Sequence, residues 1–250
     1  MKHKYLFITV GLGVVCAVAV FVLVNKQTFL QPDSSLINIH GPTSSPTSIT
    51  TSSRPPVPTL ITSSTHMIAV PFSPQAPTGN WDAVHEEMCE EVTIIMAHAW
   101  VNGIALSPAF TEGEIQKLVA WENKNFGTYI DTSARQTAQM AQAIYGLHTS
   151  IVDNPTVDQI KKQIDNGNIV IMGMAGRMLH NPNYTGAGPL YHMLLIKGYD
   201  ATGFITNDDG TRNGNSYHYS YTTLMAAAHD WSGDAASLTS NPSAAIVVSK

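Results

Sequence analysis

Cys89 is the residue of this chain best suited to chemistry, because a thiolate is a strong nucleophile. The chain has 250 residues and two cysteines, and the other one, Cys16, lies in a hydrophobic N-terminal stretch. Cys89 begins a segment whose apolar residues have helical spacing, and the N-terminus of a helix lowers the pKa of a thiol. The alternative is a structural role, since free cysteine is often a small buried hydrophobe. Cys89 is therefore a candidate nucleophile.

A cysteine nucleophile needs a general base, and histidine is the usual one. Seven histidines lie between residues 85 and 229. His192 differs from the others because it opens a hydrophobic segment directly after a loop rich in glycine and proline. This position predicts a polar side chain at the mouth of a rigid strand, where it can face a cleft. The alternative for an isolated histidine of this kind is a hydrogen-bonded place in the core.

The base also needs a group that orients it, and the residues after the next predicted strand can supply one. That strand is followed by Asn207, Asp208, Asp209 and Gly210. In a hairpin of this length its end returns beside His192, so Asp208 or Asn207 can accept the second imidazole N–H and fix the tautomer. The same residues also suit an ordinary turn. The sequence thus leaves Asp208 and Asn207 open as the orienting residue.

Four glutamates surround Cys89 in the sequence: Glu86, Glu87, Glu90 and Glu91. Near the start of a helix they match the positive end of the helix dipole and are typical of a solvated face. Carboxylates beside a thiol also disfavour the thiolate by like-charge repulsion. Because His-x-x-x-His and Cys-x-x-Cys patterns are lacking, we expect neither a bound metal nor a cofactor.

The N-terminal residues predict a membrane anchor. Tyr5 to Val24 is a stretch of 20 residues without a charge, which at about 1.5 Å per residue crosses the core of a bilayer. Residues 1–4 contain two lysines, which favour a cytoplasmic N-terminus. The stretch ends without a small-residue cleavage site, so we expect an uncleaved signal anchor. These features predict a single-pass protein of the cell membrane whose C-terminal domain lies outside the cytoplasm.

Composition separates a linker from one folded domain. Residues 25–66 are rich in serine, threonine and proline, which predicts a flexible linker. Residues 67–250 are numerous enough for one core. They contain 9 lysines and arginines against 17 acidic residues, a net charge of −8 with neutral histidines. This charge argues against a nucleic-acid partner and against a domain that lies on an anionic membrane surface.

Hydrophobic spacing predicts helices in the first half of the domain and strands in the second. The first expected helix covers residues 89–101, and the second begins at a capping box at Thr111. The third is capped by Asp131 or Thr132 and ends at about Tyr145, and two more cover residues 156–166 and 225–231. The expected strands cover residues 67–72, 169–174, 191–198, 203–207 and 244–248. Helices followed by strands joined as antiparallel neighbours indicate the α+β class.

Several segments, in this order, resemble the peptidase C39-like domain of bacteria. That family is related to the double-glycine leader peptidases and has a papain-like cysteine peptidase fold. The matching segments are Val70–Pro77, Gly79–Trp81, Cys89–Glu91, Leu190–Met193, Gly198–Asp200 and Ile205–Asp208. The resemblance covers nearly all of residues 67–250. It implies a nucleophile at a helix N-terminus in the first half and an antiparallel sheet in the second.

The resemblance also implies roles for four residues. Cys89 is expected to be the nucleophile, His192 the general base and Asp208 the group that orients the imidazole. Gln75 is expected to supply the oxyanion donor beside the backbone N–H of Cys89. Gln75 lies 14 residues before Cys89, farther than in the leader peptidases, so the segment between them must loop out.

One departure from the family is Asp209, which stands where the family often has proline and adds a carboxylate near the base. Because transporter segments and nucleotide-binding motifs do not accompany the domain, we do not expect a leader peptidase coupled to export. We expect a membrane-anchored cysteine peptidase that hydrolyses peptide or amide bonds of a peptide or protein substrate. The alternatives are a peptide-binding module with a weak or inert thiol and a related amidase or acyltransferase.

Overall fold

The computed structural model describes residues 65–250, in which five α-helices and seven strands alternate with short 3₁₀ helices. The helices are α1 (Cys89–Asn102), α2 (Pro108–Asn125), α3 (Ala134–Tyr145), α4 (Val157–Asp165) and α5 (Tyr221–Ala227), with the 3₁₀ helices η1 (His85–Glu87), η2 (Gly176–Leu179) and η3 (Ala235–Ser240). The strands are β1 (His66–Met67), β2 (His148–Asp153), β3 (Ile169–Ala175), β4 (Tyr191–Tyr199), β5 (Gly203–Asn207), β6 (Asn215–Ser220) and β7 (Ala244–Ser249).

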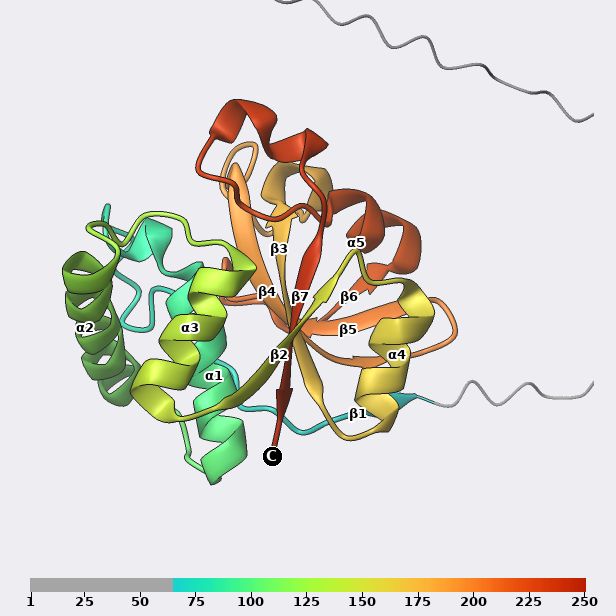
Figure 1. The fold of residues 1–250 in the computed structure, drawn as a ribbon, viewed down its shortest axis with the longest axis horizontal. Helices are drawn as coiled ribbons and strands as arrows, with labels where there is room; N and C mark the ends of the chain where they lie inside the picture. The colour runs from blue at the N-terminus through green and yellow to red at the C-terminus, as the bar shows by residue number, and fades with distance from the viewer. Residues whose placement is uncertain (1–64) are drawn as a thin grey trace, which may run out of the picture. The chain divides into compact units, whose positions relative to one another are not determined.

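The strands form one sheet in which every pair is antiparallel, in the order β2-β7-β3-β4-β5-β6, with β1 added to β4. In Figure 1, α1, α2 and α3 lie together on one side of the sheet, and α4 and α5 lie on the other. All residues of the central strands β3 and β4 are buried. The prediction of an α+β fold with an antiparallel sheet in the second half is confirmed.

The two faces of the sheet form two separate cores, because successive side chains of a strand point to opposite faces. On β3, Ile169 and Ile171 pack into the core shared with α1, α2 and α3. Val170 and Met172 pack into the core shared with α4 and α5. A sheet covered on both faces reads as continuous hydrophobic runs, which explains the apolar runs at residues 169–174 and 191–198.

Helix α1 is the central helix of the first core and packs against β4. Most of its residues are buried, and the burial surrounds the helix rather than following one stripe. It ends at Gly103, whose φ of 66° is the left-handed conformation that closes a helix. The buried packing of α1 on β4 fixes the position of its first residue, Cys89, relative to the strand.

Two predicted boundaries in the first half are wrong. Helix α2 begins at Pro108 and is capped by Ser107, whose hydroxyl accepts the backbone N–H of Phe110. Thr111 therefore lies inside the helix, and proline at the first helical position explains the earlier start. The edge strand expected over residues 67–72 is limited to His66–Met67. After it, the backbone N–H of Ile68 still donates to the carbonyl oxygen of Lys197, and Pro71 has no N–H to donate.

Other differences concern the second half of the sheet. Strands β2 and β6 were not predicted, and both lie at the edges of the sheet with mixed polar sequences. The last helix begins at Tyr221, four residues earlier than expected, because Ser220 caps it by accepting the N–H of Thr223. The helices expected at residues 89–101 and 156–166 are confirmed as α1 and α4. The cap expected for the third helix at Asp131 or Thr132 is wrong, because Ser133 caps α3 in a capping box with Gln136.

Among residues 65–250, no helix combines the length and the apolar character needed to cross a membrane. The membrane segment predicted at residues 5–24 and most of the linker predicted at residues 25–66 lie outside the described residues.

Candidate active site

Cys89 is the first residue of α1, and its sulfur lies against β4. The backbone N–H of Met193 donates a hydrogen bond to Sγ over 3.2 Å. Met193 directly follows His192 on β4. Among residues 65–250, Sγ bonds to Met193 and Glu90, and no hydrogen bond joins it to the imidazole of His192. The side chain of Cys89 is buried. The packing of α1 on β4 thus brings Cys89 into contact with Met193, which lies 104 positions later in the sequence.

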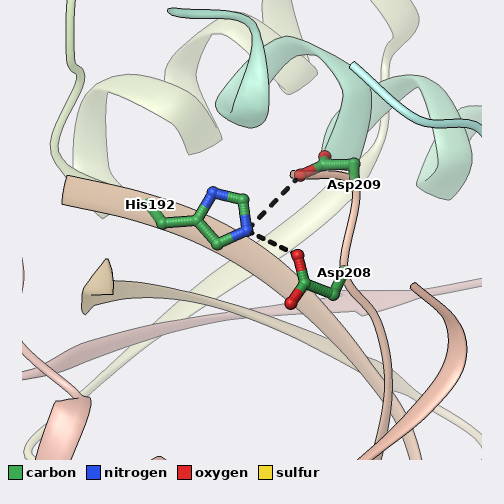
Figure 2. Close-up of side chains that lie close together, drawn as sticks. All are labelled: His192, Asp208 and Asp209. Atoms are coloured by element: carbon green, nitrogen blue, oxygen red, sulfur yellow. Dashed lines mark hydrogen bonds and ion pairs between the residues drawn. The ribbon is translucent and has the colours of Figure 1, made fainter. Parts of the chain in front are cut away.

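His192 and Asp208 form the hydrogen-bonded pair expected from the strand hairpin. Nε2 of His192 lies 2.9 Å from Oδ1 of Asp208, and both side chains are buried. Figure 2 shows the imidazole projecting from β4 with Nε2 directed at the carboxyl groups that follow β5. Since Nε2 bonds to the carboxylate, Nδ1 is the ring nitrogen left for a thiol. The hairpin β4–β5 creates the pair because its strands are antiparallel neighbours.

The Asp208 carboxylate is held by three further side chains. Its Oδ2 accepts hydrogen bonds from Asn181 at 2.9 Å, from Tyr184 at 2.8 Å and from the hydroxyl of Tyr219. Oδ1 also accepts the backbone N–H of Gly210 at 3.2 Å. These donors satisfy a buried carboxylate and fix the direction in which it faces the imidazole.

The ionisation of Asp208 follows from these contacts. Although burial opposes ionisation, the charge of His192 and the hydrogen bonds from His192, Tyr219 and Tyr184 lower the pKa of Asp208. The group is therefore a carboxylate at neutral pH, as an orienting acceptor must be. Asn207, the alternative orienting residue, instead donates its side-chain amide to the carbonyl oxygen of Pro71 at 3.0 Å.

Gln75 lies next to the site but does not present a free donor. Its side-chain Nε2 donates to the carbonyl oxygens of His85 at 2.8 Å and of Glu86 at 3.0 Å, both in the 3₁₀ helix before α1. Its backbone N–H donates to the carbonyl oxygen of Asp209. The segment between Gln75 and Cys89 loops out and forms η1, as the separation in sequence requires.

Asp209 is a second carboxyl group beside the imidazole. Its Oδ1 lies 3.7 Å from Nε2 of His192, and neither of its oxygens has a hydrogen-bond partner among residues 65–250. Burial, followed by the charges of Asp208 and Glu90, raises the pKa of Asp209 well above its ordinary value. Burial thus disfavours the ionised form of Asp209, in contrast to its neighbour Asp208, whose pKa is lowered.

Glu90 contacts the thiol directly. Its Oε2 lies 2.9 Å from Sγ of Cys89, and its Oε1 accepts the backbone N–H of Thr132 at 2.7 Å. Burial raises the pKa of Glu90 to about 8. Burial also raises the pKa of Cys89, and the charges of Glu90 and Asp209 raise it further. In this structure the sulfur is therefore a protonated thiol at neutral pH.

The described residues also include one group that could hold a metal ion. His192, Asp208 and Asp209 each offer a ligand atom, and these atoms lie within 4.8 Å of one another. The hydrogen bond between Nε2 of His192 and Oδ1 of Asp208 already accounts for the short distance between these two atoms. A metal ion would have to replace the proton in that bond, so the same atoms cannot orient the base and ligate a metal together.

The sequence matches the model of the Peptidase_C39 like family over residues 67–236. The chain belongs to this family. The fold is also similar to the crystal structure of a candidate C39-like peptidase from Bacillus anthracis, with a TM-score of 0.50 and 15% sequence identity. The match covers 75% of this chain and 98% of the Bacillus anthracis chain. No curated protein matches the sequence.

Several residues of the C39-like site could not be identified from the spacing of residues in the sequence. Asn181 and Tyr184 belong to the long loop before β4, and Tyr219 belongs to β6, which was not predicted. Their role follows only from the folded position of the Asp208 carboxylate. The sequence showed that Glu90 is near Cys89, but the burial that keeps Glu90 neutral depends on the packing of α1.

The C39-like domain also buries a carboxyl pair away from this site. Glu91 on α1 and Glu122 on α2 are fully buried, and none of their side-chain oxygens has a hydrogen-bond partner among residues 65–250. Burial, followed by the neighbouring Glu122, raises the pKa of Glu91 well above its ordinary value, and burial raises that of Glu122. The expected solvated face around Cys89 is thus wrong for Glu90 and Glu91, which the packing of α1 buries.

This pair predicts a domain that loses stability as the pH rises. Glutamate titrates near 4.3 in an unfolded chain, so above that value the folded state binds more protons and the free energy of unfolding falls. We expect Glu91→Gln/Glu122→Gln to reduce the loss between about pH 5 and pH 8 by roughly 1.4 kcal/mol for each pKa unit removed. Urea unfolding at pH 5 and at pH 8 measures the free energy of unfolding of the variant and of the parent chain. Equal losses in the variant and in the parent chain would contradict the prediction, and Asp158→Asn, at an exposed position, is the control.

Proposed function

We propose that this protein is a membrane-anchored cysteine peptidase that uses Cys89, His192 and Asp208 as a catalytic triad outside the cytoplasm. One observation carries the proposal: Sγ of Cys89 accepts the backbone N–H of Met193, the residue after His192 on β4, while His192 is hydrogen-bonded to the ionised Asp208. These contacts support the proposal because the nucleophile bonds to the strand that carries the base, and the base bonds to the orienting group. Membership of the C39-like family supports peptide-bond hydrolysis as the reaction.

The proposed reaction begins with proton transfer from Cys89 to Nδ1 of His192. The thiolate then forms a bond to the carbonyl carbon of the substrate, and the carbonyl electron pair moves to oxygen. When the oxyanion collapses, the C–N bond breaks, and the amine leaves with the proton from the imidazolium. Water, deprotonated by His192, hydrolyses the thioester and releases the acid and the free thiol. Asp208 keeps the second ring proton on Nε2 throughout, so Nδ1 remains the base.

The oxyanion needs donors, and the proposal assigns them to the backbone N–H of Cys89 and the side chain of Gln75. Both N–H groups of the Gln75 amide are used by the carbonyl oxygens of His85 and Glu86. To bind the oxyanion, the amide must release one of these carbonyls when substrate enters. Each donor of this kind is worth about 10² to 10³ in turnover.

The location of the reaction is proposed from the sequence. Residues 5–24 would anchor the chain, residues 25–66 would act as a linker, and residues 67–250 would form the extracytoplasmic C39-like domain. Digestion of intact cells with an added protease would remove the domain if it is outside. Protection of the domain until the membrane is permeabilised would contradict this location.

A peptidyl acyloxymethyl ketone tests the catalytic proposal, because it alkylates a thiol that has been activated in a peptide-binding site. We expect the full-length chain to be labelled at Cys89, Cys89→Ala to lose all labelling, and His192→Ala to be labelled at least about a hundredfold more slowly. His229→Ala is the control, since this histidine bonds to the backbone of Asn241 and not to the triad. Equal labelling of the two histidine variants would contradict the proposal.

A second candidate function is a peptide-binding module with an inert thiol. The observation in its favour is the buried, protonated Cys89 with Glu90 as its hydrogen-bond partner. Alkylation rates measured against pH separate the two functions. A thiol pKa that falls below its ordinary value of about 8.5 when peptide binds supports the peptidase, and a pKa that stays above it supports the binding module.

A further inference from the structure

A cavity of about 750 Å³ lies next to the candidate catalytic residues. Gln75, Tyr191 and Gly210 line it, and each adjoins the site. Gly210 lies directly against the imidazole, since a Cβ at this position would be 2.9 Å from Cε1 of His192. A molecule bound in the cavity would therefore be next to the proposed base.

The cavity gathers the exposed apolar side chains of the domain. Trp81, Ile130 and Leu190 are 37%, 50% and 42% exposed, and all three line the cavity. Among residues 65–250, the one other large hydrophobic side chain that is exposed is Met67. Single exposed apolar side chains are normal, but their concentration at one cavity indicates a binding surface.

The cavity is also lined by carboxylates that lack cationic partners. The side chains of Glu86, Glu87 and Asp131 make no hydrogen bond or ion pair with another residue of the described chain. Arg177 also lines the cavity, with its Nε donating to the carbonyl oxygen of Gly188 at 3.4 Å, so the lining has three carboxyl groups against one guanidinium.

The carboxylates repel one another. Burial, followed by Glu86, raises the pKa of Glu87, and burial, followed by Glu87, raises the pKa of Asp131 to about 6. A cation placed among them relieves this repulsion, whereas a phosphate or a carboxylate increases it. The cavity is thus complementary to a positively charged ligand that also has an apolar part.

We propose that this cavity selects peptides that carry a lysine or arginine side chain next to a large apolar residue. The cationic group lies among Glu86, Glu87 and Asp131, and the apolar side chain packs against Trp81, Ile130 and Leu190. The inference rests on the proposed function in one respect, namely that the peptide bond presented to Cys89 belongs to the molecule in this cavity. An anionic lipid headgroup or a nucleic acid does not fit the same carboxylates.

Peptide binding to full-length Cys89→Ala tests the inference without any chemical step. Three fluorescent hexapeptides of equal length are compared by anisotropy: one with Lys-Leu at its centre, one with Glu-Leu and one with Lys-Ser. We expect the Glu-Leu and Lys-Ser peptides to bind at least about tenfold more weakly than the Lys-Leu peptide. The Glu-Leu peptide loses one partly desolvated ion pair with the carboxylates. The Lys-Ser peptide loses the burial of the leucine side chain.

Protein variants assign the preference to the cavity. With Glu87→Gln/Asp131→Asn added, we expect the Lys-Leu over Glu-Leu preference to fall below about threefold. The matched control Asp158→Asn removes an exposed carboxylate on α4 and is expected to keep the full preference. Ile130→Ser tests the apolar wall and is expected to weaken the Lys-Leu peptide more than the Lys-Ser peptide.

The possible results separate this inference from the proposed function. Selective binding by Cys89→Ala supports the inference even if the parent chain cleaves nothing, a result that would count against the peptidase. Cleavage of all three peptides at equal rates would support the peptidase and overturn the inference. Equal affinity for the three peptides, or no binding to any of them, would also overturn it.

Discussion

Asp208→Asn is expected to slow the labelling of Cys89 by a peptidyl acyloxymethyl ketone at least about a hundredfold. Oδ2 of Asp208 accepts hydrogen bonds from Asn181, Tyr184 and Tyr219. In the variant, these three donors retain the amide oxygen at that place and turn the NH₂ group toward His192. An NH₂ group donates, so Nε2 must accept, and the ring proton moves to Nδ1.

The consequence is a base in the wrong tautomer. Nδ1 then carries a proton and cannot take one from the thiol of Cys89, although the shape of the site is almost unchanged. The NH₂ group also faces the backbone N–H of Gly210, which loses its acceptor. We therefore expect a slower reaction together with a loss of stability of about 1 to 3 kcal/mol, the usual result of leaving a buried donor unpaired.

The matched control for this variant is Asp230→Asn. Asp230 is another partly buried carboxyl group that accepts backbone N–H groups, those of Ala134 and Trp231, and it does not contact His192. We expect it to reduce stability without a hundredfold change in labelling. The ¹⁵N chemical shifts of His192 identify the tautomer directly. A tautomer and a labelling rate unchanged in Asp208→Asn would show that Asp208 does not orient the base.

Glu90→Gln is expected to raise the alkylation rate of Cys89 by iodoacetamide about tenfold at pH 8. In the parent chain, ionisation of Glu90, whose pKa is about 8, opposes formation of the thiolate. The backbone N–H of Thr132 fixes the amide oxygen of the variant at the place of Oε1. Its NH₂ group then faces the sulfur and stabilises the thiolate as a hydrogen-bond donor.

The direction of this effect with pH is part of the prediction. Well below pH 8 Glu90 is neutral and able to donate to sulfur, so the parent and the variant should react at similar rates. Near and above pH 8 Glu90 is a carboxylate, and only the parent chain is slowed. Glu91→Gln is the matched control, because Glu91 has the same side chain in the same turn of α1 but adjoins Glu122. A rate increase that is equal in both variants, or independent of pH, would contradict the role of Glu90.

The sequence predicts the elements of this fold where a local signal is strong. Helix α4 and the apolar run of β3 are of this kind, and their bounds are close to those expected. Strand β6 could not be predicted, because its alternation of serine, tyrosine and histidine has no clear apolar face. Its place in the sheet depends on pairing with β5, which is a tertiary contact.

In the candidate site, too, features with a local signal could be predicted, and features that depend on tertiary packing could not. The hydrogen bond between His192 and Asp208 could be expected, because a hairpin brings the two strand ends together. The orientation of the Gln75 amide toward the carbonyls of η1 could not, because it depends on how the preceding loop packs. The sequence also indicates the carboxyl groups near Cys89, but not that Glu90 and Asp209 are buried and that burial raises the pKa of both.

Strand β4 has a consequence for how this protein can diversify. It carries His192 and the N–H that holds the thiol, and β3 and β5 are hydrogen-bonded to its two sides. A central strand held on both sides cannot shift its register without breaking the sheet. The loop of residues 177–190 ends where this strand begins and forms part of the cavity wall. Substitutions at residues 185–190, which keep Asn181 and Tyr184 in place to hold Asp208, should therefore change which peptides bind while leaving the reactivity of the thiol unchanged.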